Sequence, residues 1–152
     1  MFNLFKKTNK NQETIEDEFF GKLLFIEATQ YVPSYLFGAK EFRSLNSEVE
    51  YQIYNDTKTV SQEQREWVTE IENNYDGLKV EIETFINSEL AKIDGKEKKF
   101  NLENDLNIDL ITIPKNLNPV VEWSLTYGVE KDFAFFTVEF RNWKPYSFQV
   151  SA

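Results

Sequence analysis

One apolar stripe of helical period occupies the middle of this chain and limits the folds it can adopt. From Trp67 to Ile93, large apolar residues recur at steps of three and four, the spacing of one face of an α-helix. The stripe stays in phase through Gly77. The sequence therefore predicts either one helix over residues 61–94 or two helices that break near Gly77.

Signals for both ends of this helical segment are present. Ser61 is followed three residues later by Gln64, which is the spacing of a capping box. At the other end, Asp94 and Gly95 supply a stop signal, because glycine readily adopts the left-handed conformation that closes many helices. The helix is therefore predicted to lie between two stretches of a different period.

Those two stretches alternate apolar and polar residues, as strands do. Strand patterns are found at residues 22–26, 47–53, 108–113, 121–127, 133–140 and 146–150. Residues 28–46 fit either a further strand interrupted by a turn or an ordered aromatic loop. Together these patterns predict an α+β fold, with a mostly antiparallel sheet of five to six strands and one long, or broken, helix packed on one face.

The length of 152 residues fits one ordinary domain. Residues 1–15 are predicted to be a flexible N-terminal tail, and residues 16–152 a single domain. No apolar run is long enough for a secretory signal or a membrane-spanning helix. These features predict a soluble cytoplasmic protein.

Histidine and cysteine are both absent from the sequence. Many soluble enzymes use these side chains for metal binding and for proton transfer near neutral pH. The five glycines are dispersed and form no phosphate-binding loop. We therefore expect no metal, no cofactor and no conventional catalytic residues, and the balance leans against an enzyme.

An excess of acidic residues indicates the kind of partner. There are 26 Asp and Glu against 17 Lys and Arg, which gives a formal net charge of −9. Such a field repels nucleic acids and anionic membranes and attracts basic proteins. On the predicted helix the candidate binding residues are Glu63, Glu66 and Glu70, and near the C-terminal end they are Trp143 and Tyr146, which lie in or next to a predicted turn.

Two other functions remain open. Glu48 and Glu50 lie on one face of a predicted strand, about 6.5–7 Å apart, which suits a carboxylate-based hydrolase or a divalent-cation site. Asp105 with Asp109, and Glu130 with Asp132, are weaker pairs of the same kind. The third function is a homo-oligomeric structural module in which an edge strand pairs with its twin. The oligomeric state itself is not predicted.

Three segments together look like small bacterial domains of unknown function. They are Glu18-Phe19-Phe20-Gly21-Lys22-Leu23, the helix start Ser61-Gln62-Glu63-Gln64, and Trp123-Ser124-Leu125 with the aromatic hairpins that follow. The similarity extends over residues 16–150. Some families of this kind are immunity proteins of bacterial toxin systems. The resemblance therefore implies an immunity protein that neutralises a basic toxin, and it transfers no functional residue to this chain.

Overall fold

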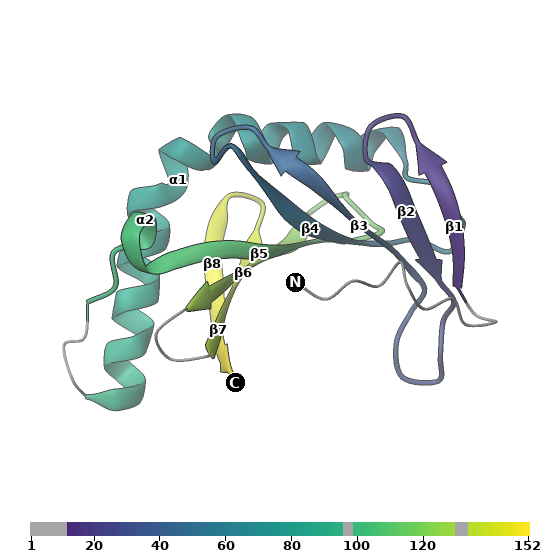
Figure 1. The fold of residues 1–152 in the computed structure, drawn as a ribbon. Coiled ribbons are helices and arrows are strands. Elements are labelled where there is room, and N and C mark those ends of the chain that lie inside the picture. Colours follow the sequence, from purple (N-terminus) through teal and green to yellow (C-terminus); the bar gives the residue numbers. More distant parts are fainter. Residues whose placement is uncertain (1–11, 96–98, 130–133) are drawn as a thin grey trace.

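One long helix lies against one face of a single sheet in the computed structural model, which describes residues 12–95, 99–129 and 134–152 (Figure 1). The elements are β1 (Gln12–Asp17), β2 (Gly21–Ile26), β3 (Tyr35–Phe42), β4 (Ser47–Tyr54), α1 (Gln62–Asp94), α2 (Leu102–Asp105), β5 (Leu106–Ile113), β6 (Glu122–Val129), β7 (Ala134–Arg141) and β8 (Lys144–Ser151). The α+β class and the long helix on a mostly antiparallel sheet are thus confirmed.

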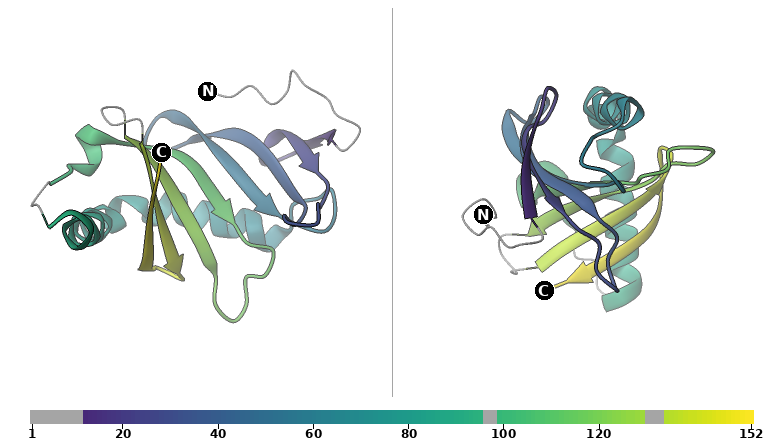
Figure 2. Two further views of the ribbon diagram at one scale, coloured as in Figure 1. Left: turned by 90° about the horizontal axis from the view of Figure 1, so that it is seen from below. Right: turned by 90° about the vertical axis from the view of Figure 1, so that its right-hand side faces the viewer.

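The strands lie in the sheet in the order in which they occur along the chain. Every neighbouring pair is antiparallel except β4 and β5, which are parallel. A parallel pair needs a long crossover connection, and α1 with α2 provides it between these two strands. The helix therefore connects the two antiparallel halves of the sheet in the chain, and it runs across one face of the sheet, as Figure 2 shows.

The prediction of five to six strands was wrong, because the described sheet has eight. Residues 28–46 contain β3, whose alternation is interrupted by Gly38. β1 begins at Gln12, inside the stretch predicted as a tail, and its polar sequence QETIED gives little apolar periodicity. β1 is held by pairing along its whole length with β2, a contact that local sequence does not reveal.

The helical segment forms one continuous helix and does not break near Gly77. The predicted capping box is present: the Ser61 hydroxyl accepts from the Gln64 backbone N–H, and the Gln64 side chain accepts from the Ser61 N–H. Gly95 ends the helix with a left-handed φ of 62°. Figure 1 shows α1 curving as it crosses the sheet.

The core lies between α1 and the sheet. From the helix it takes one face, Val68, Ile71, Tyr75, Ile82 and Ile86, all buried. From the sheet it takes the alternate residues of β2 to β7. They include Leu23, Leu36, Phe42, Tyr51, Ile53, Trp123, Tyr127 and Phe140. The hydroxyls of Tyr75 and Tyr127 satisfy each other at 3.0 Å inside this core.

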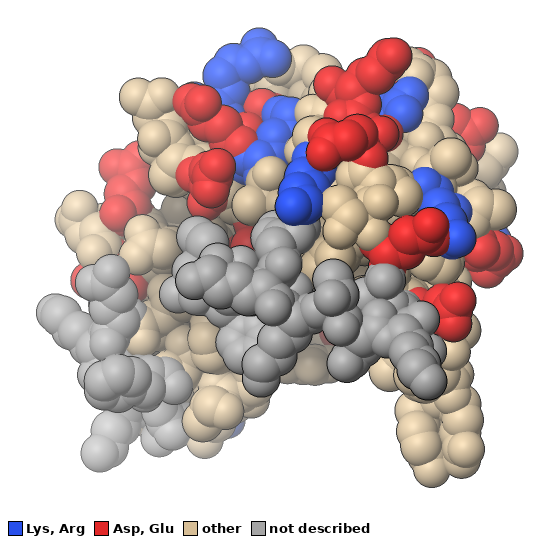
Figure 3. Space-filling model, turned by 45° about the vertical axis from the view of Figure 1, so that its right-hand side comes forward, with Lys and Arg blue, Asp and Glu red and all other residues tan. Residues whose placement is uncertain are grey.

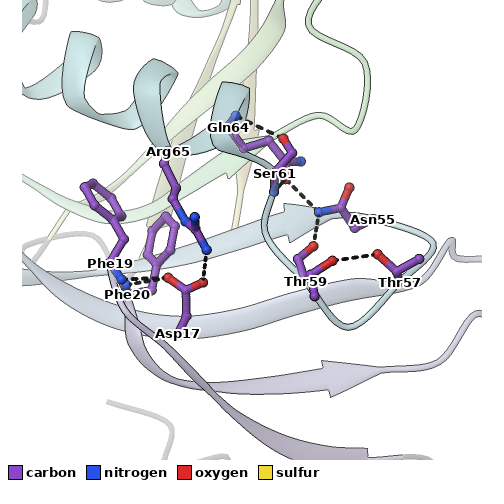
Figure 4. A network of polar contacts seen from close by, with 9 residues as sticks. All are labelled: Asp17, Phe19, Phe20, Asn55, Thr57, Thr59, Ser61, Gln64 and Arg65. Carbon is purple, nitrogen blue, oxygen red and sulfur yellow. Dashed lines mark hydrogen bonds and ion pairs between the residues drawn. The ribbon is translucent and has the colours of Figure 1, made fainter.

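Two buried polar side chains attach the helix to the sheet. Gln64 is fully buried, and its amide nitrogen donates to the carbonyls of Tyr54 and Pro114, each at 3.0 Å. Its amide oxygen accepts from Asn55 and from the Ser61 N–H (Figure 4). Gln64 thereby joins the first turn of α1 to the ends of β4 and β5.

The second attachment is the carboxylate of Glu72, whose side chain is only 4% exposed. It accepts from the Lys40 ammonium at 2.8 Å and from the backbone N–H of Arg43 at 3.4 Å. Both partners belong to β3 and the turn that follows it. A buried charge is tolerated only with such partners, so Glu72 has a structural role.

Candidate protein-binding surface

The outward face of the first half of α1 carries the predicted acidic residues. Gln64, Val68 and Ile71 occupy the buried side of the helix. Glu63, Glu66 and Glu70 are also spaced by three and four residues, so they share a face of the helix, and this face points away from the buried one. All three side chains are exposed. The structure thus brings these three predicted residues together on one surface.

A groove runs along one flank of this acidic face. Its volume is about 470 Å³. The lining residues are Glu18, Phe19, Gln62, Arg65, Glu66, Thr69, Glu70 and Asn73. The groove therefore separates α1 from the turn between β1 and β2, and it has carboxylates on both of its walls.

Arg65, the one cation in this part of the helix, is already paired. Its guanidinium donates to the Asp17 carboxylate at 2.7 Å, and the second oxygen of Asp17 accepts from the backbone N–H groups of Phe19 and Phe20, both at 2.9 Å (Figure 4). Burial raises the pKa of Asp17. The hydrogen bonds from Arg65 and the two N–H groups outweigh that effect and leave the pKa below its usual value.

The pairing with Asp17 decides the charge of the groove. Since the Arg65 charge is balanced by Asp17, the carboxylates of Glu18, Glu66 and Glu70 remain as the net charge of its lining. Within the described residues none of these three forms an ion pair. On the side of the molecule seen in Figure 3, basic and acidic side chains stand next to each other.

Trp143 borders the acidic face on its other flank. It follows β7 in the turn to β8 and stacks on Trp67 of α1, with ring centroids 4.5 Å apart and planes 19° from parallel. Trp67 lies four residues after Glu63 and three before Glu70, so the ring pair adjoins the carboxylates. Trp123 is buried, whereas Trp67 is only half-buried.

Tyr146 lies elsewhere. Its hydroxyl donates to Glu139 at 3.1 Å, and the Arg141 guanidinium lies 4.2 Å from its ring centroid. Glu139 alternates with buried Val138 and Phe140 of β7, so it points away from α1. Tyr146 is therefore on the face of the sheet opposite the helix, and the structure separates it from Glu63, Glu66 and Glu70.

In the sheet, the predicted carboxylate pairs have neighbours that the sequence did not predict. Glu48 and Glu50 do share a face of β4, but the neighbour that affects Glu50 electrostatically is Asp109 of β5. Burial and the negative charge of Asp109 raise the pKa of Glu50, and burial raises that of Asp109. The described residues contain no group of three side chains suited to hold a metal ion. Glu130 and Asp132 lie outside the described residues.

Sequence reasoning missed the far wall of the groove and the pairing that sets its charge. Glu18 and Phe19 come from the β1–β2 turn, and Asp17 is 48 positions away from Arg65 in the sequence. No local pattern connects the two segments. Only the run Glu16-Asp17-Glu18 before a turn gives a signal, and it says nothing about which helix it faces.

Comparisons with known proteins do not assign this chain to a family. No protein-family model matches the chain, and neither the curated proteins nor the solved structures contain a match. The resemblance to immunity-type domains therefore stays a prediction. No helix within the described part of the chain is both long and apolar enough to cross a membrane.

Proposed function

We propose that this chain is a non-enzymatic binding domain that receives a basic protein on the acidic face of α1. The observation that supports it most is the groove beside that face. Its lining keeps the charge of Glu18, Glu66 and Glu70, because Arg65 is balanced by Asp17. Carboxylates on two walls of an open groove suit a lysine or arginine side chain of a partner.

The rest of the surface supports the same partner. Phe19 offers an apolar wall for the methylene part of a long basic side chain. Trp67 and Trp143 form an aromatic border at the other flank, and such rings contribute strongly to protein interfaces. The net charge of −9 would accelerate the encounter with a basic protein. An immunity protein that neutralises a basic toxin belongs to this class.

The test is titration calorimetry with the protein encoded by the neighbouring open reading frame. The double variant Glu66→Gln/Glu70→Gln is expected to weaken binding by about tenfold or more, because it removes two carboxylates at the contact. Binding by the unaltered chain should also weaken as salt rises from about 0.05 to about 0.3 M, because salt screens attraction between exposed charges.

The matched control is Glu48→Gln/Glu122→Gln. It removes the same number of charges from residues that lie on the sheet, away from α1. If charge position matters, the control should bind within about twofold of the unaltered chain. The proposal fails if the neighbouring protein does not bind, or if both double variants weaken binding equally.

A further inference from the structure

β8 is the last strand of the sheet, and its outer edge is free. Within the described residues it pairs only with β7 and leaves a row of backbone N–H and C=O groups on its other side. The sequence from Pro145 to Ala152 contains no charged side chain. After the irregularity next to Pro145, the pairing with β7 is regular to Ser151, so the free groups along this part of the edge keep the regular spacing that another strand needs.

The other edge of the sheet is protected in the way natural proteins protect edge strands. β1 carries Glu13, Glu16 and Asp17, of which Glu13 pairs with Lys58 and Asp17 with Arg65. Two copies of β1 brought side by side would place carboxylates against carboxylates. In β8 such protection is confined to the start of the strand, where Lys144, Pro145 and the irregularity lie. From Tyr146 onward the two edges therefore differ in what they can accept.

Apolar side chains beside the free edge remain partly uncovered. Val150 is 48% exposed and lies next to Phe136 across the strand pair. Phe135, which is 41% exposed, lies across from Ser151. A strand added along β8 would cover part of both side chains while satisfying the free backbone groups.

We propose that β8 pairs in antiparallel fashion with β8 of a second copy, across a two-fold axis. This pairing is self-complementary, because uncharged residues face uncharged residues along the strand and the two Lys144 residues lie at opposite ends. Since β1 cannot pair with itself in the same way, the assembly closes as a dimer and does not extend into a fibre.

Sedimentation velocity of the full chain tests the proposal, with a dimer as the expected result. Val150→Lys introduces a charge at the edge and should weaken the dimer by about tenfold or more. The control Thr14→Lys places the same residue on the exposed edge of β1 and should leave the dimer unchanged. A chain that stays monomeric up to about 1 mM, or a dimer that Val150→Lys does not weaken, overturns the proposal.

Hydrogen exchange provides a second measurement if Val150→Lys does not fold. In the unaltered chain, amides of β8 should exchange more slowly as protein concentration rises, and amides of β1 should not. Exchange in β8 that is independent of concentration contradicts the dimer. Added salt should strengthen the dimer, because each copy carries −9, whereas it should weaken binding of a basic protein. The dimer and the proposed binding function can therefore fail separately.

Discussion

At the scale of single residues, Gly38 is required by a close approach between strands. A Cβ atom at this position would lie 2.8 Å from the backbone oxygen of Lys22 and 2.5 Å from a methyl group of Leu23. The backbone contact cannot be relieved by rotating a side chain. Gly38 therefore lets β3 pack against β2 within the face that supports α1.

We expect Gly38→Ala to lower the free energy of unfolding by about 1–3 kcal/mol, because β2 and β3 must move apart. Gly77→Ala is the control, since a Cβ there meets nothing within 4 Å and alanine favours the helix. It should raise the free energy of unfolding by about 0.5–1 kcal/mol. Urea unfolding of both variants measures the difference, and effects of the same sign would contradict this account.

Glu50 gives a prediction about pH. Burial and the charge of Asp109 raise its pKa in the folded state above the usual 4.5. The folded chain then holds a proton that the unfolded chain has already released, so this group's contribution to stability falls as pH rises through 4.5 to the raised value. Asp17, whose pKa is lowered, acts in the opposite direction: its contribution is present above the usual value of 3.8 and is lost as pH falls below it.

Replacing Glu50 by Gln removes the group that loses stability with rising pH. The melting temperature of Glu50→Gln minus that of the unaltered chain should therefore be larger at pH 7 than at pH 4. Glu48→Gln removes the same charge from the same strand and serves as the control. Thermal unfolding followed by circular dichroism decides between them, and an equal pH effect in the two variants would refute the raised pKa of Glu50.

At the scale of elements, polar contacts attach α1 to the sheet in addition to the packing of its apolar stripe. Gln64 alone makes four side-chain hydrogen bonds, to Ser61, Asn55, Tyr54 and Pro114. The last two are at the ends of the parallel strands β4 and β5. Gln64 therefore fixes where the helix starts relative to the only parallel pair in the described sheet.

Gln64→Ala should lower the free energy of unfolding by about 2–4 kcal/mol, because buried donors and acceptors lose their partner and a small cavity is left. Gln62→Ala, two residues earlier and exposed, should change it by no more than about 0.5 kcal/mol. Chemical denaturation gives both values. A small effect of Gln64→Ala would mean that water replaces the amide.

At the scale of the whole molecule, the chain presents two different surfaces on two different layers. The helix layer presents Glu63, Glu66 and Glu70 with their groove, and the sheet layer ends in the uncharged edge of β8. Under the two proposals, charge would attract a basic protein to the first surface and oppose a second copy at the other. Opposite responses to salt are therefore the signature that both surfaces act independently.

The sequence by itself determined a helical segment, its two ends and the class of fold, because these depend on contacts between residues close together in the chain. It left open whether that segment is one helix or two. It also placed Glu63, Glu66 and Glu70 on one outward face. Tertiary structure alone decided that β1 joins the sheet, that Asp109 lies near Glu50, and that Asp17 balances Arg65. Each of these depends on which strands and turns become neighbours, and a local pattern does not specify partners that lie dozens of residues away.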